Sequence, residues 1–460
     1  MEQQKMFQDE KLATAPLGKL IFSLAIPSVI AQLINVVYNM VDRIYIGHIP
    51  GVGSQALTGL GLSLPVVLLI QAFSALAGMG GAPLASIQLG KGNRQEAERI
   101  LGNCVSLLLL FAVVLTVGFH IGKTPLLYLF GASDATVGYA VDYLNIYLYG
   151  TIFVMAYQGL NMFISCQGHA KTAMVSVLIG AVLNIALDPL FIFGFQMGIK
   201  GAALATVISQ GVSAVWVVCF LCSKKTGLHI RRSNLRPDFA ILPGVLALGI
   251  SPFIMQSTES LINIVLNRGL QQYGGDLYVG TLTILQSVMQ LILIPVQGFS
   301  QGTQPIVSYN YGAGNVERVR RTFQIAVSII WGFSFLLTGS MMLFPRFFAG
   351  VFTSDAALLE LAGKQMPVFL AGLLIFGIQM TCQTTFMGLG KAKVSLFIAL
   401  WRKVILLIPL ALIFPHFWGA EGIYRAEPVA DIVSALTAAM LFYITVWRKE
   451  LSPKRKAKND

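Results

Sequence analysis

The chain has 460 residues, of which 55% are hydrophobic and only 11% carry a charged side chain, and its mean hydropathy is +0.73. A soluble domain of this length carries about a quarter charged residues, so the composition excludes a water-soluble globular protein. The formal net charge of +12 is compatible with nucleic-acid binding, but the basic residues follow the topology of a membrane protein, and we expect no nucleic-acid partner.

Apolar runs of roughly 20 residues, each long enough to cross the bilayer as a helix, recur along the whole chain. The sequence predicts an all-α polytopic membrane protein with twelve transmembrane helices, near 20–46, 55–82, 98–120, 136–162, 172–195, 199–222, 240–267, 278–304, 320–344, 357–384, 394–415 and 421–446. The first apolar run is long and lacks a small-residue cleavage site, so we expect it to be retained and not removed as a signal peptide.

The basic residues are distributed unequally between the two sides of the membrane. With a cytoplasmic N-terminus, 25 of the 32 Lys and Arg residues fall on the inner side, and this count assigns Arg402 and Lys403 to an inner segment. Such a bias follows the positive-inside rule. We therefore expect a multi-pass protein of the bacterial inner membrane with both termini in the cytoplasm.

Two stretches of the chain read alike, "GGAPLASIQLGKGNRQEAER" and "QGTQPIVSYNYGAGNVERVRR". At an offset of 222 residues they share seven identities, which pair Gly80, Pro83, Ser86, Gly90, Gly92, Asn93 and Arg99 with Gly302, Pro305, Ser308, Gly312, Gly314, Asn315 and Arg321. Further on, Gly168 and Lys171 match Gly388 and Lys391 at 220, and Gly198 and Gly201 match Gly419 and Gly422 at 221. The repetition indicates an internal duplication.

Each half holds an even number of helices, so the two repeats enter the membrane in the same direction and are parallel. We expect a cytoplasmic N-terminal segment (1–19), an N-lobe (20–222), a cytoplasmic linker (223–239), a C-lobe (240–446) and a basic tail (447–460). Two six-helix bundles that face each other across a central cleft are typical of transporters.

Acidic residues inside apolar helices need a physical reason, because a charge at mid-bilayer costs about 2.5–3.5 kcal/mol on insertion scales. Asn184 and Asp188 are four residues apart and share one helix face, while Thr206 and Asp42 lie at comparable depth in their own helices. Oxygen ligands of this kind suit a small hard cation, and two adjacent carboxylates can alternatively share a proton. A third reading is that Asp188 and Pro189 end the helix at the interface.

Methionine and aromatic side chains on the fourth helix, with polar groups on the seventh, predict an adaptable substrate surface. The candidates are Tyr157, Met155 and Met162, together with Gln256 and Glu259. Ordinary packing against lipid or core explains the same pattern equally well.

Several segments resemble the multidrug and toxic compound extrusion (MATE) family: "IPSVIAQLINVVYNMVDRIYIG", the repeated "LGKGN" and "YGAGN", and "LNIALDPLFIFG" followed by "GIKGAALATVIS". The resemblance implies efflux of lipophilic, often cationic drugs by alternating access, coupled to Na+ or H+. It implies a cation site, with Na+ as one candidate ion, at Asp42, Asn184, Asp188 and Thr206. Other members use acids of the seventh and tenth helices; Glu259 matches the first, but the tenth helix has no acid, so we expect Glu259 to serve substrate or proton.

Two other classes of protein fit the sequence less well. A lipid-linked precursor flippase of the same superfamily would have extra helices or a cleft rich in buried basic residues, and neither is evident from the sequence. An intramembrane aspartyl protease would show a Gly-x-Gly-Asp motif, which neither aspartate helix contains. We therefore expect no enzymatic activity, no cofactor beyond the coupling ion, and a monomer whose partners are its substrates and the bilayer.

Overall fold

The structure is a computed structural model that describes residues 11–452, and within that range every regular element is a helix. The N-terminal half contains α2 (Leu17–Gly47), α3 (Gly53–Gly90), α4 (Arg94–Leu129), α5 (Val137–Tyr149), α6 (Thr151–Ser165), α7 (Ala170–Pro189), the π-helical turn η1 (Leu190–Gly194) and α8 (Ile199–Cys222). The short η2 (Arg232–Asn234) lies between the halves.

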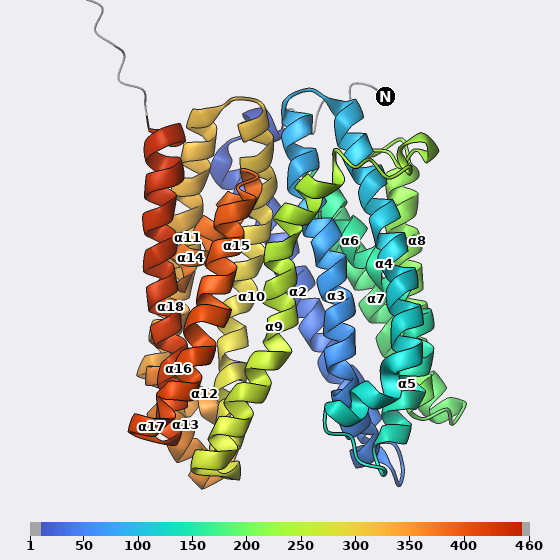
Figure 1. The fold of residues 1–460 in the computed structure, drawn as a ribbon, viewed down its shortest axis with the longest axis vertical. Helices are drawn as coiled ribbons and strands as arrows, with labels where there is room; N and C mark the ends of the chain where they lie inside the picture. The colour runs from blue at the N-terminus through green and yellow to red at the C-terminus, as the bar shows by residue number, and fades with distance from the viewer. Residues whose placement is uncertain (1–10, 453–460) are drawn as a thin grey trace, which may run out of the picture.

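The C-terminal half repeats this succession of helices. It contains α9 (Leu242–Gly274), α10 (Asp276–Gly312), α11 (Val316–Leu343), α12 (Pro345–Gly350), α13 (Ala356–Leu370), α14 (Leu373–Gly388), α15 (Ala392–Leu400), η3 (Trp401–Leu407), α16 (Ile408–Ile413), α17 (Pro415–Trp418), α18 (Ala420–Phe442) and η4 (Tyr443–Leu451). We call α2–α8 the N-lobe and α9–η4 the C-lobe. The elongated helices run side by side, and α2 begins at the same end of the molecule where η4 ends (Figure 1).

The expected number of spans agrees approximately with the structure. Within residues 11–452, ten helices are long and apolar enough to cross a membrane, and the bent pair α13 and α14 makes an eleventh. The twelfth expected run, 136–162, is occupied by α5 and α6, of which α6 is a shorter apolar helix.

The fourth and tenth runs are interrupted at corresponding places. Gly150 separates α5 from α6, and Gly372, exactly 222 residues later, stands between α13 and α14, whose axes differ by 43°. A Cβ built on Gly150 would lie 2.5 Å from Val207 Cγ2, and one on Gly372 would lie 2.5 Å from Asp431 Cβ. Gly-interrupted helices at matching positions of two repeats are a general pointer to a transporter's binding region.

The repeated motif "LGKGN/YGAGN" is explained by a turn that both lobes use. Gly92 and Gly314 adopt φ of +76° and +70°, a region that strongly favours glycine. The side chains of Asn93 and Asn315 then cap α4 and α11 by accepting a backbone N–H of the first helical turn.

The structure corrects the repeat register before α7 and α15. Gly168 and Gly390 both have positive φ, +85° and +69°. His169 N–H donates to Ile164 O, and Lys391 N–H makes the equivalent bond to Phe386 O. The offset here is therefore 222, and the predicted match of Gly168 with Gly388 at 220 is wrong.

The lobes meet tightly near the end where α3 and α10 terminate. A Cβ on Gly90 would lie 1.9 Å from Tyr309 O, and one on Gly312 would lie 2.0 Å from Ile87 O. The two backbones can approach this closely only because both residues are glycine. Towards the opposite end, α3 and α9 diverge (Figure 1). We call the end where α3 and α10 terminate the closed end.

Each lobe has a hydrophobic core of its own. One buried cluster extends from Ile46 to Val245 and another from Ile262 to Ala430. Large apolar side chains remain exposed along the outer helices, for example Leu110 and Val113 on α4, at 57% and 61%. Such exposure is expected of surfaces that face lipid.

Candidate functional site

The N-lobe gathers oxygen-bearing side chains from three helices. α7 supplies Asn184 and Asp188, and the Asn184 amide nitrogen lies 3.2 Å from Asp188 Oδ1 and 3.4 Å from Thr206 Oγ1 of α8. Thr206 donates its hydroxyl to Ala202 O at 3.0 Å. Asp42 of α2 interacts directly with the Asp188 carboxyl. All four residues predicted from the sequence therefore lie together, and we call them the oxygen cluster.

The oxygen cluster has more acceptors than donors. Asp42 Oδ1, Asn184 Oδ1 and Asp188 Oδ2 are buried, and none has a hydrogen-bond partner among residues 11–452. Asp188 is fully buried, and Asp42 is 8% exposed. A buried polar group without a partner costs about 1–3 kcal/mol. A proton or a small cation would supply what these oxygens lack, so the donor set fits either ion.

The backbone around Asp188 explains its depth. α7 ends at Pro189, but the chain continues directly into η1 and keeps Asp188 inside a continuous helical rod. The reading in which Asp188 lies at an exposed helix end is therefore wrong. π-Helical turns of this kind occur frequently at functional sites.

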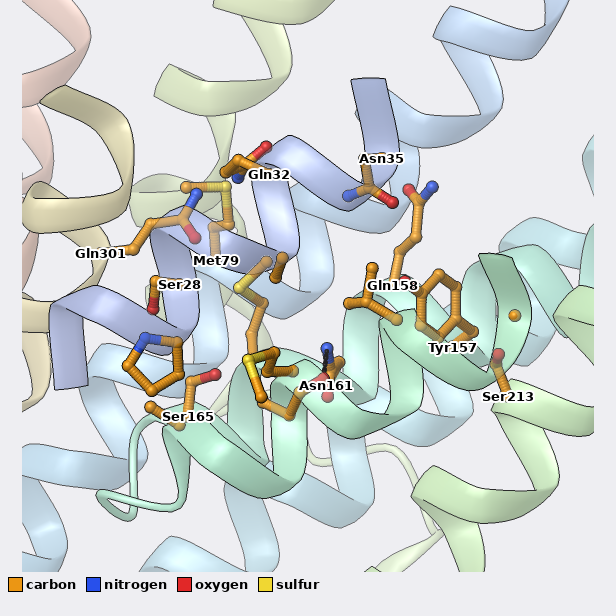
Figure 2. Close-up of a pocket in the computed structure, with 18 of the residues that line it drawn as sticks. Ser28, Gln32, Asn35, Met79, Tyr157, Gln158, Asn161, Ser165, Ser213 and Gln301 are labelled. Atoms are coloured by element: carbon orange, nitrogen blue, oxygen red, sulfur yellow. Dashed lines mark hydrogen bonds between the residues drawn. The ribbon is translucent and has the colours of Figure 1, made fainter. Parts of the chain in front are cut away.

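A cavity of about 300 Å³ opens beside the oxygen cluster. α2 lines one side with Ser28, Gln32 and Asn35, and α6 lines the facing side with Tyr157 and Asn161 (Figure 2). Gln301 reaches it from α10 of the other lobe.

The cavity wall is polar but uncharged. No Asp, Glu, Lys or Arg among the described residues lines it. Ten carboxamide side chains do: Gln32, Asn35, Asn39, Gln71, Gln158, Asn161, Asn184, Gln210, Gln301 and Gln304. Methionines contribute adaptable apolar surface, namely Met79, Met162 and Met174. A wall of this kind accepts varied ligands, because amides both donate and accept hydrogen bonds.

The cavity and the oxygen cluster share part of their walls. Asn184 and Thr206 belong to both. An ion that reorients the Asn184 amide therefore changes a surface that a cavity ligand touches.

The predicted substrate residues divide into two groups. Tyr157 and Met162 line the cavity. Met155 is fully buried in the N-lobe core, while Gln256 and Glu259, on α9, are not part of the cavity wall.

The C-lobe contains a second polar cluster that joins α9, η3 and α18. Lys403 Nζ lies 2.5 Å from Glu259 Oε2. Arg402 places Nε 2.6 Å from Asp431 Oδ1 and Nη2 3.2 Å from Glu427 Oε1. The Arg402 guanidinium also lies 4.8 Å from the centre of the Phe376 ring. We call these five ionisable residues the C-lobe network.

Four members of the C-lobe network were missed or misplaced by sequence reasoning. Arg402 and Lys403 do not lie in an inner segment, because they are 8% and 7% exposed inside the span Ala392–Trp418. Glu427 and Asp431 were not recognised as intramembrane acids, although they lie in the apolar span Ala420–Leu451. Their i,i+4 spacing, the same as that of Asn184 and Asp188, was the available signal.

Comparison with known proteins agrees with the fold and the duplication. A sequence model described as MatE matches the chain twice, at residues 27–190 and 252–413. The chain is 24% identical over 449 residues to the multidrug export protein MepA of Staphylococcus saprophyticus, covering 96% of this chain and 97% of that protein. MepA of Staphylococcus aureus gives the same figures.

Solved structures of MATE and MOP superfamily transporters have similar folds. A MATE crystal structure in the bent conformation superimposes with a TM-score of 0.88 at 25% identity, covering 95% of this chain and 97% of the other. An outward-facing multidrug resistance MATE transporter of the MOP superfamily gives 0.87 at 25% identity, with 94% and 97% covered. A MOP superfamily transporter from Pyrococcus furiosus, described as having a binding pocket of reverse polarity, gives the same values.

Proposed function

The chain belongs to the MatE family, that of the multidrug and toxic compound extrusion (MATE) transporters, and on this premise we propose that it is an antiporter that exports lipophilic, often cationic compounds in exchange for Na+ or H+. We place it in a bacterial cell membrane as a monomer with both termini in the cytoplasm. The relatives named multidrug export protein support the export role.

One observation carries the coupling part of the proposal. Three buried oxygens of the oxygen cluster lack donors among residues 11–452, and two residues of that cluster, Asn184 and Thr206, also form the cavity wall. When the ion binds, these oxygens turn towards it, and the cavity loses its previous shape and hydrogen-bonding groups. Such differential affinity is what coupling requires, because a ligand that binds two states equally shifts neither.

The contact between the lobes supports an alternating-access cycle. The closed end is sealed by backbone contacts at Gly90 and Gly312, while α3 and α9 diverge at the other end. With cytoplasmic termini, the closed end faces the cytoplasm. Separation of α3 from α10 would open the cavity to the cytoplasm in the other half of the cycle.

The cavity favours drug export over the lipid-flippase alternative. A lipid-linked precursor carries an anionic phosphate headgroup, and such a ligand requires fixed positive charge. The cavity wall has none among its described residues, and the buried Arg402 and Lys403 are both paired with carboxylates. An uncharged amide wall suits neutral or delocalised cationic compounds instead.

Dye uptake into inside-out membrane vesicles tests the proposal. We expect an imposed Na+ or proton gradient to drive a fluorescent cationic dye inward, and we expect Asp42→Asn and Asp188→Asn each to lower the driven rate by at least about tenfold, a change of roughly 1.4 kcal/mol. The amide keeps the shape of the side chain but neither its charge nor its proton.

A matched substitution controls for the loss of an aspartate as such. Asp142, whose carboxylate pairs with Lys200 at 3.3 Å, has a 39% exposed side chain, so Asp142→Asn should transport at the wild-type rate. If both cluster variants retained gradient-driven uptake, or if neither gradient moved dye in the wild type, the proposal would be abandoned.

A further inference from the structure

The C-lobe network has an unbalanced charge. It contains three carboxylates, Glu259, Glu427 and Asp431, and two bases, Arg402 and Lys403. With every group ionised, the network carries one excess negative charge. Four of the five side chains are at least nine-tenths shielded from solvent, and only Glu259 is substantially exposed, at 43%. An uncompensated charge at this depth is costly.

One oxygen of the network also lacks a partner. Asp431 is 1% exposed, and its Oδ1 accepts from Arg402 Nε, but Oδ2 is buried with no hydrogen-bond partner among residues 11–452. The position is tight, because a Cβ on Gly372 would lie 3.1 Å from this oxygen. A donor is therefore missing at the point where a positive charge is also missing.

We propose that the C-lobe binds one proton, carried by Glu427 and donated in a hydrogen bond to Asp431 Oδ2. The proton comes from water as H3O+, forms the O–H bond of the Glu427 carboxylic acid and leaves H2O behind. It brings the network to zero net charge and satisfies the unpartnered oxygen in one step. Arg402–Asp431 and Lys403–Glu259 then remain as two complete ion pairs.

The pairing distances select Glu427 as the group that takes the proton. Its Oε1 lies 3.2 Å from Arg402 Nη2, whereas Asp431 is held at 2.6 Å and Glu259 at 2.5 Å by their bases. Glu427 is thus the most weakly paired of the three acids. It lies one helical turn before Asp431 on α18, so the two side chains share a face.

Arg402 and Lys403 are the bases whose charge acts on Glu427. η3 presents Arg402 and Lys403, α9 presents Glu259, and α18 itself presents Asp431. Lys364 of α13 and Arg425 of α18 are both paired with Glu421. The facing part of α14 contributes the amides Gln379 and Gln383, α16 has no ionisable residue, and His416 of α17 is exposed and contacts Ile413 O.

A proton fits this site better than a metal ion. Arg402 and Lys403 already occupy the space between the acids. Among residues 11–452, no three His, Cys, Asp or Glu side chains are grouped so as to hold a metal ion. The proposal is independent of the ion that the oxygen cluster binds.

Infrared spectroscopy of the purified full-length protein, in which the spectrum of each variant is compared with that of its parent, tests the proposal without any transport assay. The parent protein carries Asp42→Asn and Asp188→Asn, which remove the acids of the oxygen cluster. We expect this parent to show one carbonyl stretching band of a protonated carboxylic acid. Glu427→Gln should abolish the band because the protonated group is gone, and Asp431→Asn should also abolish it, because the two remaining acids and two bases then balance without a proton.

Two controls keep the outcome decisive. Glu421→Gln alters another acid of α18, which is paired with Lys364 outside the network, and should leave the band unchanged. If Glu427→Gln does not fold, labelling all Glu with ¹³C in the parent should shift the band, whereas labelling all Asp should not. Absence of the band from the parent, its persistence in Glu427→Gln, or its loss on adding Na+ at constant pH would each overturn the assignment, the last in favour of a sodium site.

Discussion

The N-lobe cavity and the C-lobe network occupy corresponding places in the two repeats. Three independent features fix the correspondence. Gly168 and Gly390 set an offset of 222, and Gly198 and Gly419, with φ of +57° and +56°, set an offset of 221. The paired contacts Gly80–Gly249 and Gly302–Ala25 set 224 for α2 and α9. In these registers, the cavity-lining residues Asn35, Gly180, Ala181, Thr206 and Gln210 become Glu259, Arg402, Lys403, Glu427 and Asp431.

One lobe is therefore hollow where the other is filled. The N-lobe cavity has a volume of about 300 Å³, while the corresponding C-lobe space, lined in part by Arg402 and Lys403, has about 10 Å³. Gly180 and Ala181 leave room that two long basic side chains occupy in the other repeat. The duplicated architecture thus forms a ligand cavity in the N-lobe, whereas the side chains of the C-lobe network fill the corresponding space in the other lobe. We therefore expect substrate to bind only on the N-lobe side.

The largest expected effect comes from removing Arg402, the base of the C-lobe network that pairs with two acids. Arg402→Gln leaves three acids, two of them buried, with one base, and removing one partner of a buried ion pair typically costs about 3–5 kcal/mol. We expect a large fall in thermal stability of the purified protein. The double variant Arg402→Gln/Asp431→Asn should recover most of it, because the stranded charge is removed.

The same experiment in the N-lobe should give the opposite result. Asp42→Asn removes one of two neighbouring carboxylates that form no salt bridge among residues 11–452, so we expect unchanged or improved thermal stability. Equal destabilisation by Arg402→Gln and Asp42→Asn would show that the two lobes do not differ in charge compensation.

The second prediction concerns what the lobes share. Gly90→Val and Gly312→Val each place a branched side chain against backbone of the other lobe, at positions where even a Cβ would lie within 2.0 Å of an oxygen. We expect each to hold the closed end apart and to reduce dye transport by about tenfold or more. Gly118→Val and Gly332→Val are matched controls, since a Cβ at either position meets nothing within 4 Å. A single impaired glycine variant would contradict the equivalence of the two contacts.

The third prediction tests whether substrate binds only in the N-lobe. Ala181→Leu inserts volume into the cavity wall, and overpacking of this kind costs about 1–3 kcal/mol. We expect the KM for dye to rise about tenfold with little change in kcat at saturation. Val182→Leu, on an exposed position of the same helix, should have no effect. An unchanged KM in Ala181→Leu would place the substrate elsewhere.

Helices, duplication and the oxygen cluster could be predicted because each leaves a local or periodic signal. Asn184 and Asp188 are isolated polar residues in an apolar run, and their i,i+4 spacing puts them on one face. Thr206 and Asp42 required only a depth argument. The residue set Asp42, Asn184, Asp188 and Thr206 is the one that the structure assembles.

The C-lobe network was not predicted, because its residues indicate a buried charge cluster only when they are considered together. Arg402 and Lys403 read as a helix-end basic pair, and Glu427 follows Arg425 in a stretch that looks interfacial. Their pairing depends on the three-dimensional proximity of η3 and α18, which no sequence spacing reveals. Met155 and Met162 lie seven residues apart on nearly the same face of α6, so the choice between them depends on how far the cavity extends along the helix, and only Met162 lines it.

The smallest expected effect is a difference in acid stability between two corresponding N-cap residues. His169 is the N-cap residue of α7, and Lys391 is the N-cap residue of α15. Burial, with a contribution from Lys11, lowers the pKa of His169 to about 4. The unfolded chain binds this proton near pH 6.5 and the folded protein only near pH 4, so the stability that neutral His169 contributes above pH 6.5 is lost progressively as the pH falls from 6.5 to 4.

Burial lowers the pKa of Lys391, but the hydrogen bond to Glu450 and the charges of Tyr311 and Glu450 together raise it above its usual value, so Lys391 stays charged across that range. The acid sensitivity of this turn should therefore belong to the N-lobe alone. We expect His169→Gln to reduce the drop in Tm between pH 7 and pH 4.5 by about one degree for each kcal/mol involved, the scale that applies to a protein of this length. His48→Gln, at an exposed histidine, should leave the drop unchanged. If the two variants behave alike, the low-pH loss of stability originates in the buried carboxylates of the lobes, and the two caps are equivalent in charge as well as in position.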